Sequence, residues 1–108
     1  MNTPAVLTQY RAAVSELKAL RRQTDSLQGG GSGEVLALLR RRESQLAQAV
    51  FAFEHLLESV ENPRDRAVLR LFYGAGETDA AIADELRMSE RQIVRIRKAA
   101  VERLSFLP

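Results

Sequence analysis

The chain has 108 residues, enough for one domain or for a small domain with an appendage. Its residues are 45% hydrophobic and 28% charged, which is ordinary for a globular protein and argues against a disordered chain. Cysteine is absent, which excludes disulfides and thiolate metal sites. No stretch approaches the roughly 20 apolar residues that span a bilayer, and the N-terminus MNTPAVLTQYR lacks the pattern of a signal peptide.

The first predicted element is an amphipathic helix over about residues 4–28. Thr3 is expected to cap it, with Pro4 at the first helical position, where a missing N–H costs nothing. Apolar side chains then recur at alternating steps of four and three residues, which is a heptad seam. The seam consists of Val6, Tyr10, Ala13, Leu17, Leu20, Thr24 and Leu27.

The sequence GGGSG at residues 29–33 predicts the end of this helix, because glycine loses much backbone freedom in a helix. It resembles an engineered flexible linker, but a natural loop between two helices serves equally well and is the interpretation we favour. The two readings predict the same hairpin.

A second long helix is expected to begin near Ser32 or Glu34 and to run to about Glu61. Its apolar stripe is too wide for one partner helix, so it should also contact the C-terminal segment or another hairpin. Arg42 interrupts the seam and needs either water or a carboxylate partner. The stripe comprises Val35, Leu36, Leu38, Leu39, Leu46, Ala49, Val50, Phe53, Leu56, Leu57 and Val60.

The two seams predict an antiparallel, coiled-coil-like hairpin over residues 1–61 that forms homo-oligomers. The basic run at residues 40–42 has two readings, a second phosphate contact or a solvated face, and the second is the commoner one. The residues expected to mediate oligomerisation are Tyr10, Leu17, Leu20, Leu39, Leu46 and Phe53.

A third helix is predicted from Arg64 to Tyr73, after a boundary at Asn62 and Pro63. Asp65 and Arg66 are expected on its solvent side. Gly74 and Gly76 should end it. The side chains expected to face a core are Ala67, Val68, Leu69, Leu71 and Phe72.

Residues 78–104 read as two short helices separated by a tight turn at Arg87 and Met88, which is the pattern of a helix-turn-helix. Ser89 is expected to cap the second helix, with Glu90 at the positive end of its dipole. The first helix should present an apolar face of small residues, made by Ala80, Ala81, Ile82, Ala83 and Leu86. In the second helix the inward-facing residues should be Ile93, Ile96, Ala100 and Leu104.

The outer face of this second helix is expected to carry polar and cationic side chains. Arg and Gln make paired hydrogen bonds to base edges in the major groove, whereas Lys and Arg neutralise phosphates. Charge is distributed accordingly: residues 87–108 carry a net +4, against +1 for residues 1–60 and −3 for residues 61–86. This asymmetry favours a polyanionic partner. The face consists of Arg91, Gln92, Arg95 and Lys98.

Three stretches together resemble the region 4 helix-turn-helix of sigma factors: PRDRAVLRLFY at 63–73, ETDAAIADEL at 77–86 and SERQI at 89–93. With the preceding hairpin, the chain is similar to small phage regulators of the RinA and ArpU type. The resemblance implies an all-α fold, with a helix-turn-helix domain at 62–108, and control of phage or prophage transcription in the cytoplasm of a bacterial host. At the position before Ala80, where such domains often carry an aromatic residue, this chain has Asp79.

The resemblance also implies roles for individual residues. Double-stranded DNA is the expected partner and RNA polymerase a further one, without a cofactor. The residues expected to read bases are Ser89, Arg91, Gln92 and Arg95. Those expected to contact phosphates are Arg87, Arg97 and Lys98.

Four alternatives stay open at this stage. The basic helix could belong to an ordinary helical bundle. The protein could be a DNA-packaging protein like a small terminase subunit, although those commonly place the DNA-binding domain first. It could instead bind polymerase or a sigma factor without reading bases. A metal site at His55 with Glu54 and Glu58 lacks further ligands. Catalysis is not expected, because Cys is absent, the single His has no plausible relay, and the Gly-rich loop lacks the Lys-Ser/Thr of a phosphate-binding loop.

Overall fold

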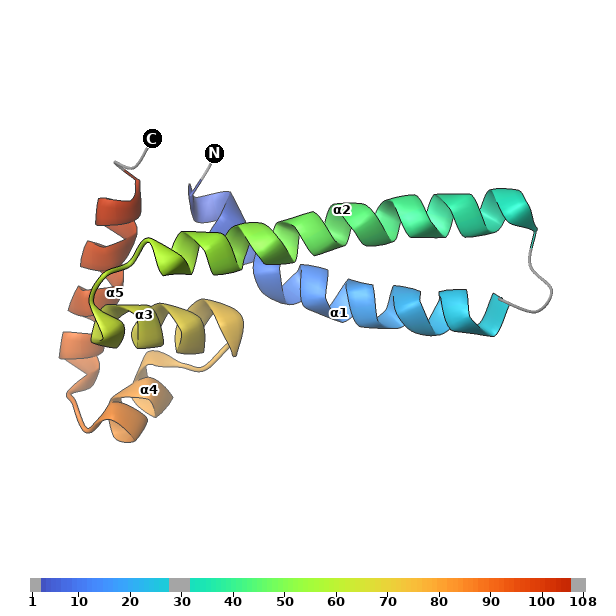
Figure 1. Cartoon of the computed structure of the whole chain (residues 1–108). Helices are drawn as coiled ribbons and strands as arrows, with labels where there is room; N and C mark the ends of the chain where they lie inside the picture. Colours follow the sequence, from blue (N-terminus) through green and yellow to red (C-terminus); the bar gives the residue numbers. More distant parts are fainter. Residues whose placement is uncertain (1–2, 28–31, 106–108) are drawn as a thin grey trace.

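The computed structural model describes residues 3–27 and 32–105, and all secondary structure within these ranges is helical. A long antiparallel pair, α1 (Thr3–Leu27) and α2 (Gly33–Glu58), projects from a compact head (Figure 1). The molecule is correspondingly elongated, with extents of 54 × 32 × 17 Å. These features confirm the predicted all-α hairpin followed by a helix-turn-helix.

The head is built from α3 (Pro63–Leu69), the π-helical turn η1 (Arg70–Gly74), α4 (Asp79–Leu86) and α5 (Glu90–Leu104). The predicted third helix therefore changes its winding after Leu69, and the Ala75 N–H donates to the Arg70 carbonyl five residues earlier. In Figure 1, α5 lies at the end of the molecule opposite the hairpin tip.

The ends of the long helices differ from the prediction. Thr3 is the first residue of α1 and so is not its cap as predicted, and the preceding residue lies outside the described residues, as does most of the 29–33 loop. Ser32 caps α2, and its hydroxyl accepts from the Val35 N–H at 3.1 Å. The helix ends at Glu58, not Glu61, because extended backbone at Asn62 is needed to cap α3 just ahead of Pro63.

The hairpin is held by a cluster of side chains that interlock between α1 and α2. Thr24 is also buried, and its hydroxyl donates to the Leu20 carbonyl at 3.0 Å. Arg42 pairs with Glu16 across the hairpin at 2.8 Å, which is the carboxylate alternative of the two that the sequence left open. The buried members of the cluster are Ala13, Leu17, Leu20 and Leu46, with Leu39, Ala49 and Val50 packed against them.

The residues that were expected to join separate copies of the protein pack against one another within the chain. Tyr10 stacks on Phe53 within the chain, with ring centroids 3.9 Å apart. Leu17, Leu20 and Leu46 are buried in the hairpin. All six proposed oligomerisation residues pack within the chain, although Tyr10 and Leu39 are only partly buried, and their role between copies stays a prediction. Two seam members stay outside it, since Val35 and Leu38 are 43% and 59% exposed.

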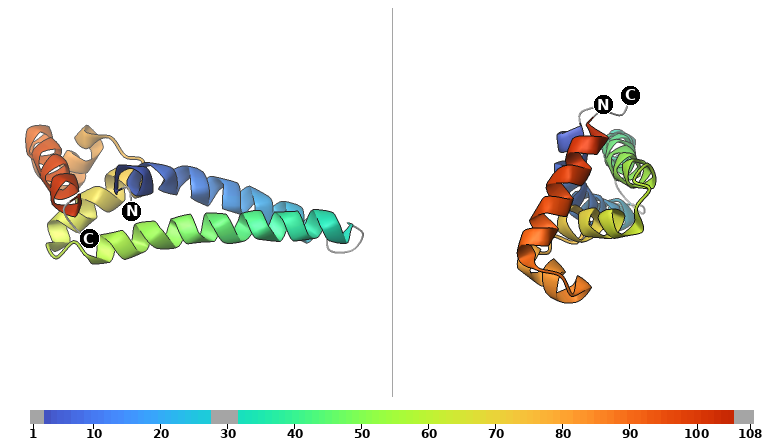
Figure 2. Two further views of the ribbon diagram at one scale, coloured as in Figure 1. Left: turned by 90° about the horizontal axis from the view of Figure 1, so that it is seen from above. Right: turned by 90° about the vertical axis from the view of Figure 1, so that its left-hand side faces the viewer.

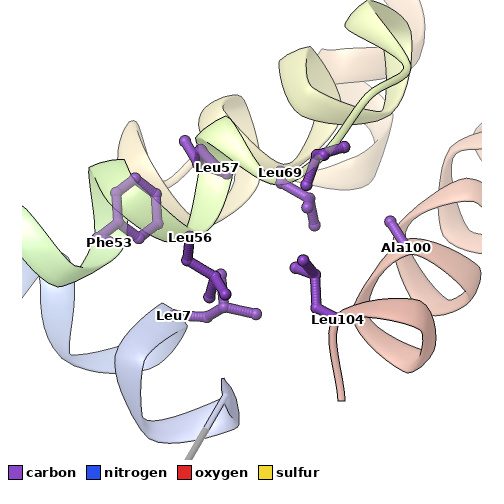
Figure 3. Packing of buried hydrophobic residues seen from close by; sticks show 8 residues of the cluster. Leu7, Phe53, Leu56, Leu57, Leu69, Ala100 and Leu104 are labelled. Atoms are coloured by element: carbon purple, nitrogen blue, oxygen red, sulfur yellow. The ribbon is translucent and has the colours of Figure 1, made fainter. Parts of the chain in front are cut away.

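A second core joins the hairpin to the head (Figure 3). Side chains from α1, α2, α3 and α5 meet there, so the wide stripe of α2 packs against the C-terminal segment as expected. Leu7 is 1% exposed and was not part of the predicted seam. The buried members are Leu7, Phe53, Leu56, Leu57, Val60, Leu69, Ala100 and Leu104.

Asp65 was predicted on the solvent side of α3, and this prediction is wrong. The residue is 3% exposed, with Arg64 and Arg103 at 3.5 and 3.4 Å from its carboxylate oxygens. It also lies in the first turn of α3, where the helix dipole favours a negative charge. The carboxylate thus ties the start of α3 to the end of α5, a contact that helical periodicity alone does not reveal.

Candidate nucleic-acid interface

The motif begins with α4, whose inner side is narrower than predicted. Thr78 caps the helix, accepting from the Ala81 N–H at 3.1 Å. Ile82 and Ala83 are buried, whereas Ala80 and Ala81 are exposed, which corrects the prediction of a continuous small-residue face. In a helix of eight residues only one line of side chains can face the neighbouring helices.

The turn between the motif helices is made by Arg87 and Met88, as predicted. Arg87 ends α4 in the left-handed region, with φ 56° and ψ 50°. Its N–H points back to the last turn of α4, and the Met88 N–H donates to the Ala83 carbonyl at 2.9 Å. These bonds satisfy carbonyl groups that the end of a helix leaves free. The Arg87 side chain is exposed next to the start of α5.

A capping box fixes the start of α5. The Ser89 hydroxyl accepts from the Gln92 N–H at 3.1 Å, and the Ser89 N–H donates to Gln92 Oε1 at 2.9 Å. Sequence reasoning found the cap but not the reciprocal bond, although Ser followed three residues later by Gln is its signature. Both side chains stay exposed, and the box uses only the oxygen of the Gln92 amide for the backbone of Ser89.

The cationic side chains of α5 share one exposed face. Arg91, Arg95 and Lys98 follow one another at steps of four and three residues, so they project from the same side of the helix. The opposite side is buried through Ile93, Ala100 and Leu104, as predicted. We call Arg91, Arg95 and Lys98 the cationic stripe; Gln92 lies beside it. Figure 2 (right) views the molecule from the end that carries the head, and α5 lies in front of the rest of the molecule.

Arg97 does not join this face. Its guanidinium binds both carboxylate oxygens of Asp79, at 3.1 and 2.8 Å, and lies 4.0 Å from the centre of the Phe72 ring. The hydrogen bond and charge of Asp79 raise the pKa of Arg97. Arg97 therefore links α5 to α4 through this ion pair, and we omit it from the phosphate contacts expected from the sequence. Asp79, the departure from the resembled family, is its partner.

The outer side of α4 is acidic, in contrast to the stripe. Asp84 and Glu85 are exposed there. Burial of the Glu77 carboxyl and the adjacent charge of Glu85 raise the pKa of Glu77 above its ordinary 4.5. A surface of this sign repels phosphate, so of the two motif helices α5, with the Arg87 turn, suits a polyanion and α4 does not.

The raised pKa of Glu77 predicts a pH-dependent stability. The folded state favours the protonated carboxyl, so stability falls as pH rises from 4.5 through the raised pKa. Glu77→Gln should therefore raise the melting temperature at pH 7 and leave it unchanged at pH 4, as followed by circular dichroism. A lower melting temperature of the variant at pH 7 would show instead that the carboxylate makes a favourable contact.

Contacts between hairpin and head hold the interface in place. Arg70 of η1 forms a two-pronged pair with Glu54 of α2, both distances being 3.1 Å. Gly76 has φ 74°, and a Cβ added there would collide with the guanidinium of Arg11 from α1. These contacts link residues far apart in the sequence, and no local sequence motif predicts them.

The basic residues in the outer half of the hairpin lie away from this interface. Arg42 is paired with Glu16, and Arg21 with Glu43 at 3.4 Å. Arg40 is exposed, but α2 leads away from α5 toward the hairpin tip (Figure 1). The run at 40–42 is thus placed as a solvated face, and not beside the cationic stripe.

The described residues hold no cluster of three or more potential metal ligands. His55 lies 3.9 Å from Glu58 on the surface and stacks against Phe51. Among the helices in the described ranges, none has the length and apolarity that crossing a membrane requires.

Residues 62–105 match the family Sigma-70, region 4, which spans α3 to α5. No curated protein and no solved structure matches the chain. The C-terminal part is thus a region 4-like helix-turn-helix, a type of domain that binds DNA. The match covers the head and not the hairpin, so it identifies this segment and leaves the role of the whole chain to inference.

Proposed function

We propose that this protein is a sequence-specific regulator of transcription that inserts α5 into the major groove of double-stranded DNA. The observation that carries the proposal is the cationic stripe, exposed on one face of α5 within the segment that matches region 4. A helix fits the major groove, and its N-terminal turns reach furthest toward the bases.

Residues along α5 take different roles in this arrangement. Arg91, Arg95 and Gln92 face the base edges from the first turns of the helix, and the exposed Ser89 lies at its start. Lys98 and Arg87 lie further from that centre and suit the phosphates on either side of the groove. Phosphate contacts supply much of the affinity, whereas base contacts supply the specificity.

Arg95→Ala and Lys98→Ala separate these roles. The loss of Arg95 should cost about 1–3 kcal/mol on the preferred sequence and relax selection at one or two positions. The loss of Lys98 should weaken binding to all sequences and reduce the salt slope by about 1. Selection from a random duplex library, followed by fluorescence polarisation titrations, measures both effects. Unchanged selection by the Arg95 variant would reject base reading by this residue.

We further propose that the gene regulated is a phage or prophage gene and that RNA polymerase is a second partner. A long hairpin ahead of a region 4-like head supports this, because it resembles the architecture of the RinA and ArpU type of regulator. A reporter driven by the selected sequence in a bacterial host tests regulation. A polymerase pull-down after nuclease treatment tests the second partner without DNA.

A further inference from the structure

One side of the hairpin carries a groove between α1 and α2 that the hairpin's own side chains leave open. Its volume is about 400 Å³. Small and uncharged polar side chains line most of it, together with the ion pair that crosses the hairpin. We define the groove face by six of its lining residues: Gln9, Ala12, Glu16, Arg42, Gln45 and Ala49.

The groove face continues along the hairpin at seven-residue steps. Ala12 is followed by Ala19 on α1, while Gln45 lies between Leu38 and Ala52 on α2. A repeat of seven keeps one side of a helix turned toward a partner over its whole length. The hairpin core already uses a different seam, and four members of this second repeat are exposed: Ala12, Ala19, Leu38 and Gln45. Leu38, on this side, is 59% exposed.

We propose that the groove face binds the groove face of a second copy, forming a four-helix bundle with both heads at the same end. The charges decide this orientation. Glu16 and Arg42 lie 2.8 Å apart and so at one level of the hairpin. A twofold axis along the hairpin sets α1 against α2 of the second copy, and each Glu16 then meets an Arg42.

The opposite orientation is disfavoured by the same two residues. If the heads lay at opposite ends, α1 would face α1, and Glu16 would approach the other Glu16 near the middle of the bundle. Like charges facing each other across an interface oppose association, whereas a ring of alternating charges supports it. The small side chains of Ala12 and Ala49 allow the helices to approach closely.

In this arrangement the partner of the protein is a second copy of itself. The dimer does not depend on DNA binding, but its expected effect on DNA affinity rests on the proposed function. Because the hairpins project away from α5, joining them with heads together leaves both cationic stripes free. Two recognition helices then face the same duplex, as in dimers that bind two half-sites. Linking two heads in this way raises affinity by roughly 10²–10⁴ over one head.

Cysteine cross-linking tests the contact and its orientation, because the chain has no cysteine of its own. Ala12→Cys, ¹⁵N-labelled, is mixed with unlabelled Ala49→Cys and gently oxidised, and the products are weighed by mass spectrometry. Heads together predicts a disulfide between the two variants. Phe51→Cys is the matched control, since Phe51 is 70% exposed on another side of α2.

Three outcomes would overturn the inference. Cross-linking of Ala12→Cys with itself would indicate heads at opposite ends. Efficient cross-linking of Phe51→Cys alone would place the contact on another face. A monomeric mass of the unmodified protein by sedimentation at tens of micromolar would exclude the dimer. None of these measurements uses DNA, so they do not depend on the proposed function.

Ala12→Arg places a long cation in the groove, at an exposed position outside the hairpin core, and should make the protein monomeric. Its affinity for a duplex of about one helical turn should match the wild type, while affinity for about two turns should fall by roughly 10²–10⁴. A dimeric mass for this variant would overturn the inference. Failure of the dimeric wild type to bind any duplex would instead reject the proposed function alone.

Discussion

Phe53→Ala is expected to lower the free energy of unfolding by about 3–5 kcal/mol, the usual cost of removing a large buried aromatic side chain. Phe53 is fully buried, stacks on Tyr10 and belongs to the core shared by hairpin and head. Because the core is shared, both parts should lose structure in one transition. Urea unfolding followed by circular dichroism measures the change.

Phe51→Ala is the matched control two residues away. Phe51 is 70% exposed, so its removal should change stability by no more than about 0.5 kcal/mol. A Phe53→Ala protein that unfolds at the same urea concentration as the wild type would contradict the shared core. So would two separate transitions, one for each part.

Arg97→Ala is expected to destabilise the head by about 2–4 kcal/mol. Breaking a buried ion pair costs about 3–5 kcal/mol because it strands the partner charge, and partial solvent access lessens that cost. The side chains of Arg97 and Asp79 are 16% and 17% exposed. Arg97→Lys should be intermediate, since lysine keeps the charge but loses the two-pronged geometry and the stacking on Phe72. Thermal unfolding checks the order of the three proteins.

Arg95→Ala is the control variant for Arg97→Ala, because Arg95 lies on the same helix but is exposed. We expect near-wild-type stability and impaired DNA binding for Arg95→Ala. Arg97→Ala should show the reverse at temperatures where it is folded. If Arg97→Ala kept full stability and lost DNA binding, Arg97 would be a phosphate contact after all.

Local patterns sufficed for the elements and for the exposed face of α5. The heptad spacing of Leu17 and Leu20 located the hairpin seam, and Ser89 located the start of α5, because these signals lie within a few residues of each other. The exposure of Arg95 and Lys98 followed from the helical period in the same way. The expected separation at residues 61 and 62 stays a prediction, although the two parts share a core.

Contacts between distant segments were beyond the sequence. Asp65 looked solvated because its partner Arg103 is 38 residues away. Arg97 looked like a phosphate ligand because nothing local pairs it with Asp79, 18 residues earlier. Likewise, a heptad seam does not say whether its partner is in the same chain or another, so Tyr10 and Phe53 were assigned to oligomerisation.

The central claim is that the cationic stripe binds duplex DNA, and salt-dependent titration tests it most directly. The slope of log affinity against log salt is compared for the wild type, for Arg91/Arg95/Lys98→Ala and for a hairpin control with equal charge loss, Arg22/Arg40/Arg41→Ala. We predict that the stripe variant loses about 0.9 from the slope through Lys98, and up to about 2.7 where Arg91 and Arg95 also neutralise phosphates, and that the hairpin variant loses almost nothing. Equal losses in both variants, or no binding by the wild type at low salt, would contradict the account.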